Sequence, residues 1–326
     1  MVSRKVQDLF YKGMAYLELK SIRWAVEHLR KAIELDPDHT PSLYALGRAQ
    51  YKVGDLDQAI ECFMRVVTLE PKDQFAWFGL AVAHHDDGSY REAITAYKRG
   101  LKLNPYNEIG WLWLSVAHQE NREYPKAIKA CRKALDLNPD NLDGWILLGS
   151  IYQEMKNYTQ ALDAYQKALA LNPDSAKSWS VLASLHADKG ELAQAIEAYL
   201  NSLAIDPRDE RAWFNVGSIH LKTGDLAQAV ESFEKAAVIN PKDERSWYGL
   251  GVALHEKGDY AEAIEAFQNA VTLREKYTLA WFRLGLAYHY DGNLAEAIKA
   301  YEETLRLDPF NTLAKEALVR AKEESE

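Results

Sequence analysis

Apolar residues recur along the chain at the spacing of one face of an α-helix. Trp145, Leu148, Gly149 and Tyr152 fall at i, i+3, i+4 and i+7, which places them on one side of a helix. A second amphipathic run follows at 158–171 and ends where a proline enters, because proline cannot continue a helix. The pattern therefore predicts two amphipathic helices joined by a short turn.

This pair of helices recurs with a period of 34 residues. Alanine fills one column of the repeat without interruption: Ala25, Ala59, Ala93, Ala127, Ala161, Ala195, Ala229, Ala263 and Ala297. Tryptophan fills another: Trp77, Trp111, Trp145, Trp179, Trp213, Trp247 and Trp281. A proline column is broken only at Glu275, which we interpret as a tolerated variant. A length of 326 residues would by itself suggest two globular domains, but the period predicts one elongated array.

The combined pattern W-x2-L-G-x2-Y…A-x3-F…A…P resembles that of tetratricopeptide repeats. Trp281, Leu284, Gly285 and Tyr288 match its first helix in full. The resemblance implies an all-α fold, a right-handed α-solenoid or superhelix of antiparallel helix pairs. It further implies a single solenoid over 1–326, with repeats at 6–39, 40–73, 74–107, 108–141, 142–175, 176–209, 210–243, 244–277 and 278–311 and a capping helix at 312–324.

The two ends of the array differ in sequence. In the last helix Lys315 and Lys322 stand where earlier repeats have Trp and Tyr, and a polar outer face is what a terminal solenoid element needs. The first helix instead carries Leu9, Phe10, Tyr11, Met14 and Leu17, with no preceding repeat to cover them all. We therefore expect this uncapped first repeat to dock a partner or a second copy of the chain.

In proteins of this family the first helix of each repeat lines a concave groove in which ligands lie. Transferring the groove-facing places to this sequence gives a candidate partner-binding surface. It comprises Phe10, Met14, Tyr44, Arg48, Tyr51, Phe75, Phe78, Val82, Ile109, Leu112, Val116, Ser150, Ser184, Arg211, Phe214, Asn215, Arg245, Tyr248, Val252, Phe282 and Leu286. The alternative is that some of these aromatics only pack between repeats. We expect the aromatics to anchor a partner segment and Arg211 and Arg245 to meet a carboxylate.

Composition narrows the classes of partner. Asp and Glu number 48 against 39 Lys and Arg, which argues against a nucleic-acid binder. The longest uncharged apolar run is too short to span a bilayer, so we expect no membrane insertion. The N-terminus lacks the apolar core of a signal peptide, and two cysteines make no disulfide framework. These features favour a cytoplasmic protein.

The sequence offers little that points to catalysis. It has no Gly-rich phosphate loop, no H-E-x-x-H and no C-x-x-C, so we expect neither an enzyme nor a cofactor. His84, His118, His186 and His220 occupy the place usually held by Tyr, one period apart, which is too far for shared metal ligation. Cys131 replaces an inner aromatic and should be buried, whereas we expect Cys62 to be partly exposed.

Three hypotheses of function remain open. The first is a scaffold or adaptor that binds an extended or helical segment of a partner protein in its groove. The second is an assembly chaperone that shields an unassembled subunit, and the third is a self-assembling structural scaffold. The choice between an extended peptide and a helix is open as well.

Overall fold

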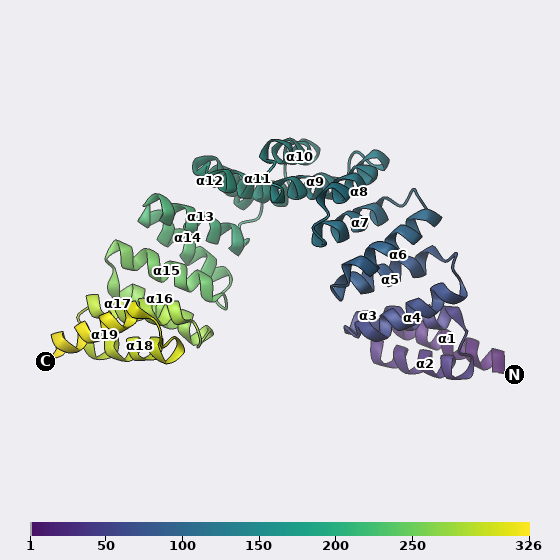
Figure 1. The fold of residues 1–326 in the computed structure, drawn as a ribbon, viewed down its shortest axis with the longest axis horizontal. Helices are drawn as coiled ribbons and strands as arrows, with labels where there is room; N and C mark the ends of the chain where they lie inside the picture. Colours follow the sequence, from purple (N-terminus) through teal and green to yellow (C-terminus); the bar gives the residue numbers. More distant parts are fainter. Residues whose placement is uncertain (1) are drawn as a thin grey trace. The chain divides into compact units, whose positions relative to one another are not determined.

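The computed structural model describes the backbone of residues 2–326 and the side chains of residues 3–326. Within this range every regular element is an α-helix, and the helices fall into two compact units divided after Leu171 (Figure 1). Unit 1 contains α1 Val2–Glu18, α2 Ile22–Leu35, α3 Thr40–Val53, α4 Leu56–Leu69, α5 Gln74–Asp86, α6 Tyr90–Leu103, α7 Glu108–Glu120, α8 Tyr124–Leu137, α9 Leu142–Glu154 and α10 Tyr158–Leu171. Unit 2 contains α11 Ala176–Lys189, α12 Leu192–Ile205, α13 Glu210–Thr223, α14 Leu226–Ile239, α15 Glu244–Lys257, α16 Tyr260–Leu273, α17 Thr278–Tyr290, α18 Leu294–Leu307 and α19 Thr312–Ser325.

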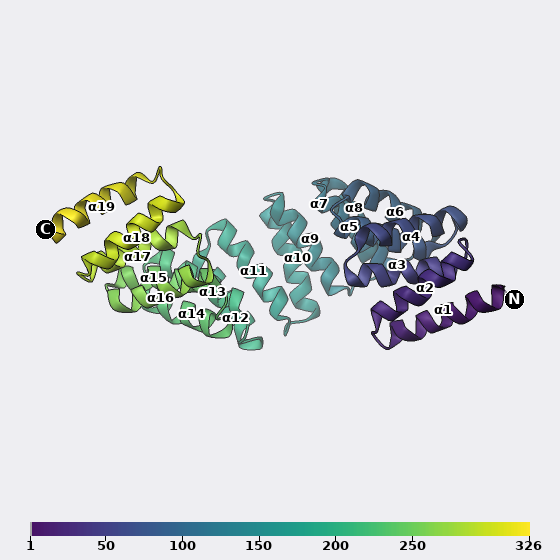
Figure 2. The ribbon, with the colours of Figure 1, turned by 90° about the horizontal axis from the view of Figure 1, so that it is seen from below.

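Each unit is a stack of antiparallel helix pairs. An odd-numbered helix packs on the even-numbered helix that follows it, and that helix packs on the next odd-numbered one (Figures 1 and 2). Successive odd-numbered helices also contact each other directly, as α1 does α3 and α13 does α15. Within the described residues, neighbouring odd-numbered helices lie closer to one another than neighbouring even-numbered helices do. The odd-numbered helices therefore line the inner side of each unit. The expected all-α solenoid of antiparallel helix pairs is confirmed.

The turns that separate the helices are fixed by local side chains. At the start of α5 the carboxylate of Asp73 accepts hydrogen bonds from the backbone N–H groups of Phe75 and Ala76, at 2.8 and 3.2 Å. At the end of α13 Gly224 has φ 84°, the left-handed conformation that stops a helix and that glycine adopts without a steric penalty. Helices such as α5 and α13 therefore begin and end where the sequence provides these signals, whereas in the described chain α2 begins without a side-chain cap and has Asp36 as its C-cap.

The tryptophan column ties each odd-numbered helix to the turn before it. The indole Nε1–H of Trp111 donates a hydrogen bond to the carbonyl oxygen of Pro105, six residues earlier, at 2.8 Å. The other six column members make the same bond at 2.8–3.1 Å. At the interrupted place Trp281 donates to the carbonyl of Glu275 at 2.9 Å. The bond needs an indole donor but only a backbone acceptor, so Glu275 replaces proline without losing it.

A second column, of aromatic rings on the even-numbered helices, holds neighbouring pairs together. The buried ring of Phe63 on α4 lies between Gly47 on α3 and Gly79 on α5. A Cβ atom added at either glycine would come within 2.8–3.0 Å of that ring, which is closer than normal van der Waals contact. The small residues therefore provide the space that a large ring fills, which gives dense packing between three helices.

Candidate partner-binding surface

Six of the predicted groove residues line one pocket on the inner side of unit 1. The pocket has a volume of about 370 Å³ and lies between α3 and α5. We call it the α3–α5 pocket. Its lining consists of the predicted residues Tyr44, Arg48, Tyr51, Phe75, Phe78 and Val82, together with Lys52, Phe63 and Gly79.

The floor of the α3–α5 pocket is aromatic. The ring of Tyr44 meets the edge of the Phe63 ring with the centroids 5.7 Å apart, and Phe78 lies 6.4 Å from the buried Tyr97. The backbone of Gly79 lies directly against the Phe63 ring, which is only 2% exposed, so a side chain at this place would collide with the ring. These contacts fix the rings in place, so the floor is preformed and apolar.

The rim of the pocket is more exposed and carries charge. Phe75 is 64% exposed, and Arg48 and Lys52 are exposed as well. The hydroxyl of Tyr51 donates a hydrogen bond to the carboxylate of Asp86, which raises the pKa of Tyr51 to about 12. The rim thus offers one free aromatic ring and two cations close to an apolar floor.

Apolar exposure continues onto α7, the next odd-numbered helix. Ile109 is 64% exposed, and Leu112 and Val116 are half-buried. Trp113, which lies outside the tryptophan column, is 43% exposed and meets the ring of His85 edge-on at 5.9 Å. The exposed apolar surface of unit 1 therefore extends from the pocket rim across α7.

Other predicted groove residues of unit 1 pack against the core or form hydrogen bonds within their own helix. Phe10 and Met14 are half-buried and pack against the hydrophobic cluster that contains Leu17 of α1. Ser150 donates its hydroxyl hydrogen bond to the carbonyl of Leu147, within its own helix. We expected the apolar side chains of the first helix to be left partly uncovered. Leu17 is buried, whereas the side chain of Tyr11 is 61% exposed.

In unit 2 the groove positions are more strongly engaged with one another. Phe214 packs on Phe233 at 5.6 Å, and the guanidinium of Arg245 lies 5.6 Å from the centroid of the Phe214 ring. Arg245 also forms an ion pair with Asp243, the N-cap of its own helix, at 2.9 Å, and this raises the pKa of Arg245. Arg211, by contrast, is exposed and forms no ion pair among the described residues.

The remaining positions of unit 2 include one correction. Val252 was predicted to face the groove but is only 7% exposed, because α15 contacts both α13 and α17 directly and these neighbours cover a short side chain. Tyr248 packs on Tyr277 at 5.1 Å, and Asn215 donates to the hydroxyl of Tyr199 at 3.0 Å. Ser184 is half-buried, and Phe282 and Leu286 pack in a cluster with Leu318 of α19.

Comparison with known families explains the period. A sequence profile of the tetratricopeptide repeat matches residues 44–108, 86–141, 217–278 and 248–312, which together are more than half of the chain. The chain belongs to the tetratricopeptide repeat family. Further profiles of the same repeat match residues 9–39, 142–175, 164–197 and 183–224. No curated protein matches the chain by sequence.

Solved structures of tetratricopeptide repeat proteins share this fold. The pilF protein of Pseudomonas aeruginosa is 19% identical, with 65% of this chain and 97% of that one covered at a TM-score of 0.55. YrrB, described as a TPR protein with an unusual peptide-binding site, is 20% identical, with 58% and 98% covered at 0.53. Cut9, in the APC/C hetero-tetramer Cut9–Hcn1, is 18% identical, with 92% and 59% covered at 0.51. At these identities the likeness shows the fold alone.

Of the four histidines at the histidine place of the repeat, His118 and His186 hydrogen-bond a carboxylate, whereas Nδ1 of His84 is buried without a partner in the part of the chain that the structure describes. His118 is buried, and its Nδ1 lies 2.6 Å from the carboxylate of Glu123; His186 and Glu191 make the same contact at 2.7 Å. Burial lowers the pKa of His118, while the hydrogen bond to Glu123 opposes that shift. Among residues 3–326 no three His, Cys, Asp or Glu side chains gather as a metal site would require.

Both cysteines are free thiols in the interior. Cys131 is fully buried, as expected, and burial raises its pKa to about 12. Cys62 corrects our expectation, because it is only 7% exposed and burial raises its pKa to about 11. It lies in the contact between α2, α3 and α4, which the position of Cys62 on its own helix does not reveal. In the described part of the chain no helix has the length and apolarity needed to cross a bilayer.

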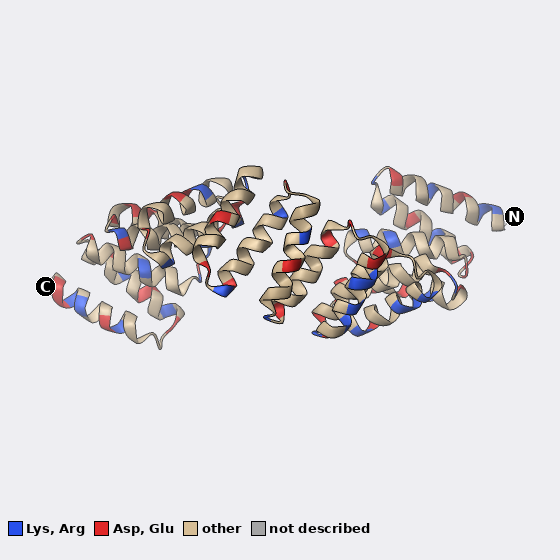
Figure 3. Ribbon diagram, turned by 90° about the horizontal axis from the view of Figure 1, so that it is seen from above, with Lys and Arg blue, Asp and Glu red and all other residues tan. Residues whose placement is uncertain are grey.

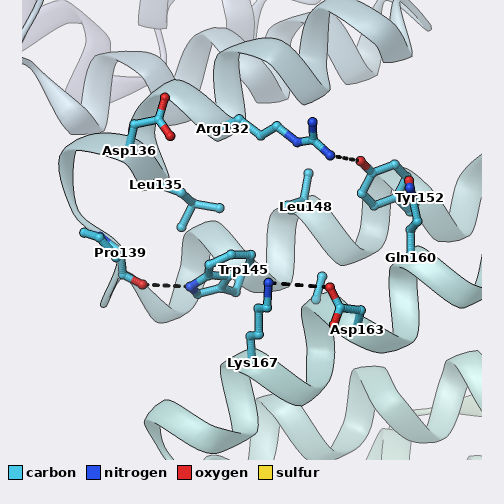
Figure 4. Close-up of a pocket in the computed structure, with 11 residues that line it drawn as sticks. Arg132, Leu135, Asp136, Pro139, Trp145, Leu148, Tyr152, Gln160, Asp163 and Lys167 are labelled. Carbon is cyan, nitrogen blue, oxygen red and sulfur yellow. Dashed lines mark hydrogen bonds and ion pairs between the residues drawn. The ribbon is translucent and has the colours of Figure 1, made fainter.

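A larger pocket, of about 590 Å³, lies on the outer side of unit 1 between α8, α9 and α10 (Figure 4). Its charged groups are paired with their neighbours, since Arg132 donates to the hydroxyl of Tyr152 at 2.8 Å and Lys167 lies 3.5 Å from Asp163. The ammonium of Lys167 also lies 4.6 Å from the centroid of the Trp145 ring. An equivalent pocket of about 340 Å³ occurs at α2, α3 and α4, so this depression is a repeated feature of helix packing.

The residues that our sequence reasoning missed are those of the pocket floor. Phe63 comes from an even-numbered helix, and Gly79 contributes an absence of side chain. The sequence shows a column of large rings at the place of Phe63, but such a column is typical of side chains buried in the core. Only the packing shows that a glycine in the following helix lets that ring reach the wall of the pocket.

Proposed function

We propose that this chain is a scaffold or adaptor that binds a segment of a partner protein in the α3–α5 pocket. Tetratricopeptide repeat proteins in general act as scaffolds for protein–protein interaction. The observation that carries the finer proposal is the pocket itself, in which six side chains from two helices surround one apolar floor. Its volume of about 370 Å³ is within the range that accommodates a bulky side chain.

The chemistry of the pocket suggests the partner segment. An aromatic or long aliphatic side chain would bury its surface against Tyr44 and Phe63 while Phe75 closes over it. Arg48 and Lys52 on the rim would pair with an acidic residue beside that anchor. The peptide-binding site reported for YrrB is consistent with this role of the fold. In this proposal the protein works in the cytoplasm, without a catalytic site or a cofactor.

A screen of random peptides displayed on phage tests the proposal. Peptides selected on the whole chain are expected to carry a bulky apolar residue next to an acidic one. Burying one Phe ring contributes ~1.5–3 kcal/mol, so Phe75→Ser should weaken these peptides about ten- to a hundredfold. Phe310→Ser, a matched change at a side chain 87% exposed in unit 2, should leave them unchanged. Equal binding by wild type and Phe75→Ser would refute the pocket.

The exposed surface on α7 favours a second candidate, the assembly chaperone. Ile109 and Trp113 extend the apolar area beyond what one anchoring side chain needs. A chaperone of this kind should suppress the aggregation of an unfolded protein such as chemically reduced insulin. Ile109→Ser with Trp113→Ser should abolish that protection while leaving selected peptides in the α3–α5 pocket. No protection by the wild-type chain would exclude this role.

A further inference from the structure

The acidic net charge of the chain is confined to one of its two units. Unit 1 holds 22 Asp and Glu against 22 Lys and Arg, whereas unit 2 holds 26 against 17. The net charge of −9 therefore belongs entirely to unit 2. Such an imbalance between two parts of the same architecture is not required by the fold.

Unit 1, although neutral as a whole, carries a concentrated basic surface on the outer side. Eight exposed cations lie on α6 and α8, two even-numbered helices that pack on opposite sides of α7. Figure 3 marks the Lys and Arg positions of the chain in blue along the ribbon. Only Glu92 and Asp136 oppose them on the same helix faces. We call this surface the basic face. It consists of Arg91, Lys98, Arg99, Lys102, Lys126, Lys129, Arg132 and Lys133.

Most cations of the basic face pair with no anionic side chain among the described residues. Lys126 pairs with Glu123 at 2.7 Å, Lys133 with Asp136 at 3.6 Å, and Arg132 donates to Tyr152. The other five cations form no ion pair within residues 3–326. Like charges held this close repel one another, so the surface lowers stability unless an anionic partner neutralises it.

Unit 2 carries a surface of the opposite sign on its own even-numbered helices. On α14 and α16 four exposed glutamates occupy the corresponding outward turns. Of these only Glu231 is paired, with Lys235 at 2.7 Å. We call this surface the acidic face. It consists of Glu231, Glu234, Glu262 and Glu265.

We propose that the chain associates with further copies of itself, with the basic face of one copy against the acidic face of the next. The occupant is identified by charge complementarity, since the same chain presents two surfaces of opposite sign that its own ion pairs leave unsatisfied. Each face lies on even-numbered helices, so the α3–α5 pocket on the odd-numbered side of unit 1 stays open in the assembly. A contact between two different faces is heterologous and adds copies in a row.

The dimensions of the faces set the strength of this association. A helix of 14 residues is about 21 Å long and about 10 Å wide with its side chains, so two such helices present roughly 400 Å². A stable complex usually buries about 800 Å² on each partner, so the contact belongs to the weak and transient class. Because it depends on exposed charges, it should disappear as salt shortens the Debye length from about 10 Å at 0.1 M toward about 3 Å at 1 M.

Sedimentation velocity of the whole chain tests the proposal. At an ionic strength of about 20 mM the sedimentation coefficient should rise with protein concentration, and at about 0.5 M it should not. Lys98→Glu, Arg99→Glu, Lys102→Glu and Lys129→Glu together reverse the sign of the basic face. Glu231→Lys, Glu234→Lys, Glu262→Lys and Glu265→Lys together reverse the sign of the acidic face. Each variant alone should remain monomeric at low salt. All eight side chains are exposed, so circular dichroism should show unchanged helix content.

Mixing the two variants gives the decisive result. One variant then has two acidic faces and the other two basic faces, so the mixture should regain association that neither shows alone. Arg4→Glu, Lys5→Glu, Arg23→Glu and Lys72→Glu together change the net charge of unit 1 equally outside the basic face and should leave association intact. A monomeric wild type at low salt, or a mixture that stays monomeric, would overturn the proposal. So would capture of the monomer by anionic phospholipid vesicles or DNA through the basic face, because the partner would then be a polyanion.

Discussion

Each column tryptophan donates a hydrogen bond to the preceding turn. We therefore predict that replacing one of these tryptophans by phenylalanine lowers the stability of the folded chain. The structure makes Trp213 a good site for the test, because its Nε1–H donates to the carbonyl of Pro207 at 3.1 Å and its ring is half-buried. Lys235 also lies 4.1 Å from the centroid of the ring. A hydrogen bond, a cation–π contact and ring packing therefore meet at one residue.

Trp213→Phe keeps a ring but removes the donor. One hydrogen bond contributes about 0.5–1.5 kcal/mol net, and the cation–π contact weakens with the smaller ring. We expect a loss of about 1–2 kcal/mol for Trp213→Phe, against about 3 kcal/mol or more for Trp213→Ala, which removes the packing as well.

Urea denaturation followed by circular dichroism measures both losses, and amide hydrogen exchange at 207–213 reports on the turn itself. Because repeat arrays can unfold in parts, the exchange rates show where stability is lost. Trp24→Phe is the matched control, since Trp24 lies outside the column and is 54% exposed. If Trp213→Phe were as stable as wild type while Trp213→Ala lost about 3 kcal/mol, the indole hydrogen bond would contribute nothing.

Two further predictions concern ionisable groups. Hydrogen bonds from Lys126 and His118 lower the pKa of Glu123 to about 2 from 4.5, so its contribution to stability is present above pH 4.5 and is lost as the pH falls toward 2. Urea midpoints measured across this range should fall less steeply for Glu123→Gln, and parallel curves would contradict the assignment. Because burial raises the thiol pKa values of Cys62 and Cys131 to about 11 and 12, both should react slowly with Ellman's reagent at neutral pH. Urea should release two fast-reacting thiols, and a fast thiol in the native chain would contradict the burial of Cys62.

Much of the architecture follows from the period alone. The spacing of Trp145, Leu148 and Tyr152 gives one helical face, and the N-cap residues and prolines give the boundaries, because these signals act within a few residues. The positions of the odd-numbered helices on one side follow from repetition of the same unit. The candidate pocket could also be reached in part, since six of its residues occupy the expected places.

Equivalent places in the repeat nevertheless end in different environments. Val82 and Val252 occupy the same place in the repeat, yet Val82 lines the α3–α5 pocket while Val252 is buried. Helix α15 contacts the odd-numbered helices on both sides of it, and these contacts, which cover Val252, depend on side chains from several repeats at once. The pocket floor at Phe63 and the burial of Cys62 have the same origin.

The sequence by itself therefore determined the helices, their order and the family of this protein, because those depend on local spacing repeated along the chain. Tertiary structure alone decided which apolar residues stay open to a partner. It also decided which cations have no internal counterion. Each of these depends on contacts between helices that are distant in sequence, and no periodicity specifies the separation of those helices.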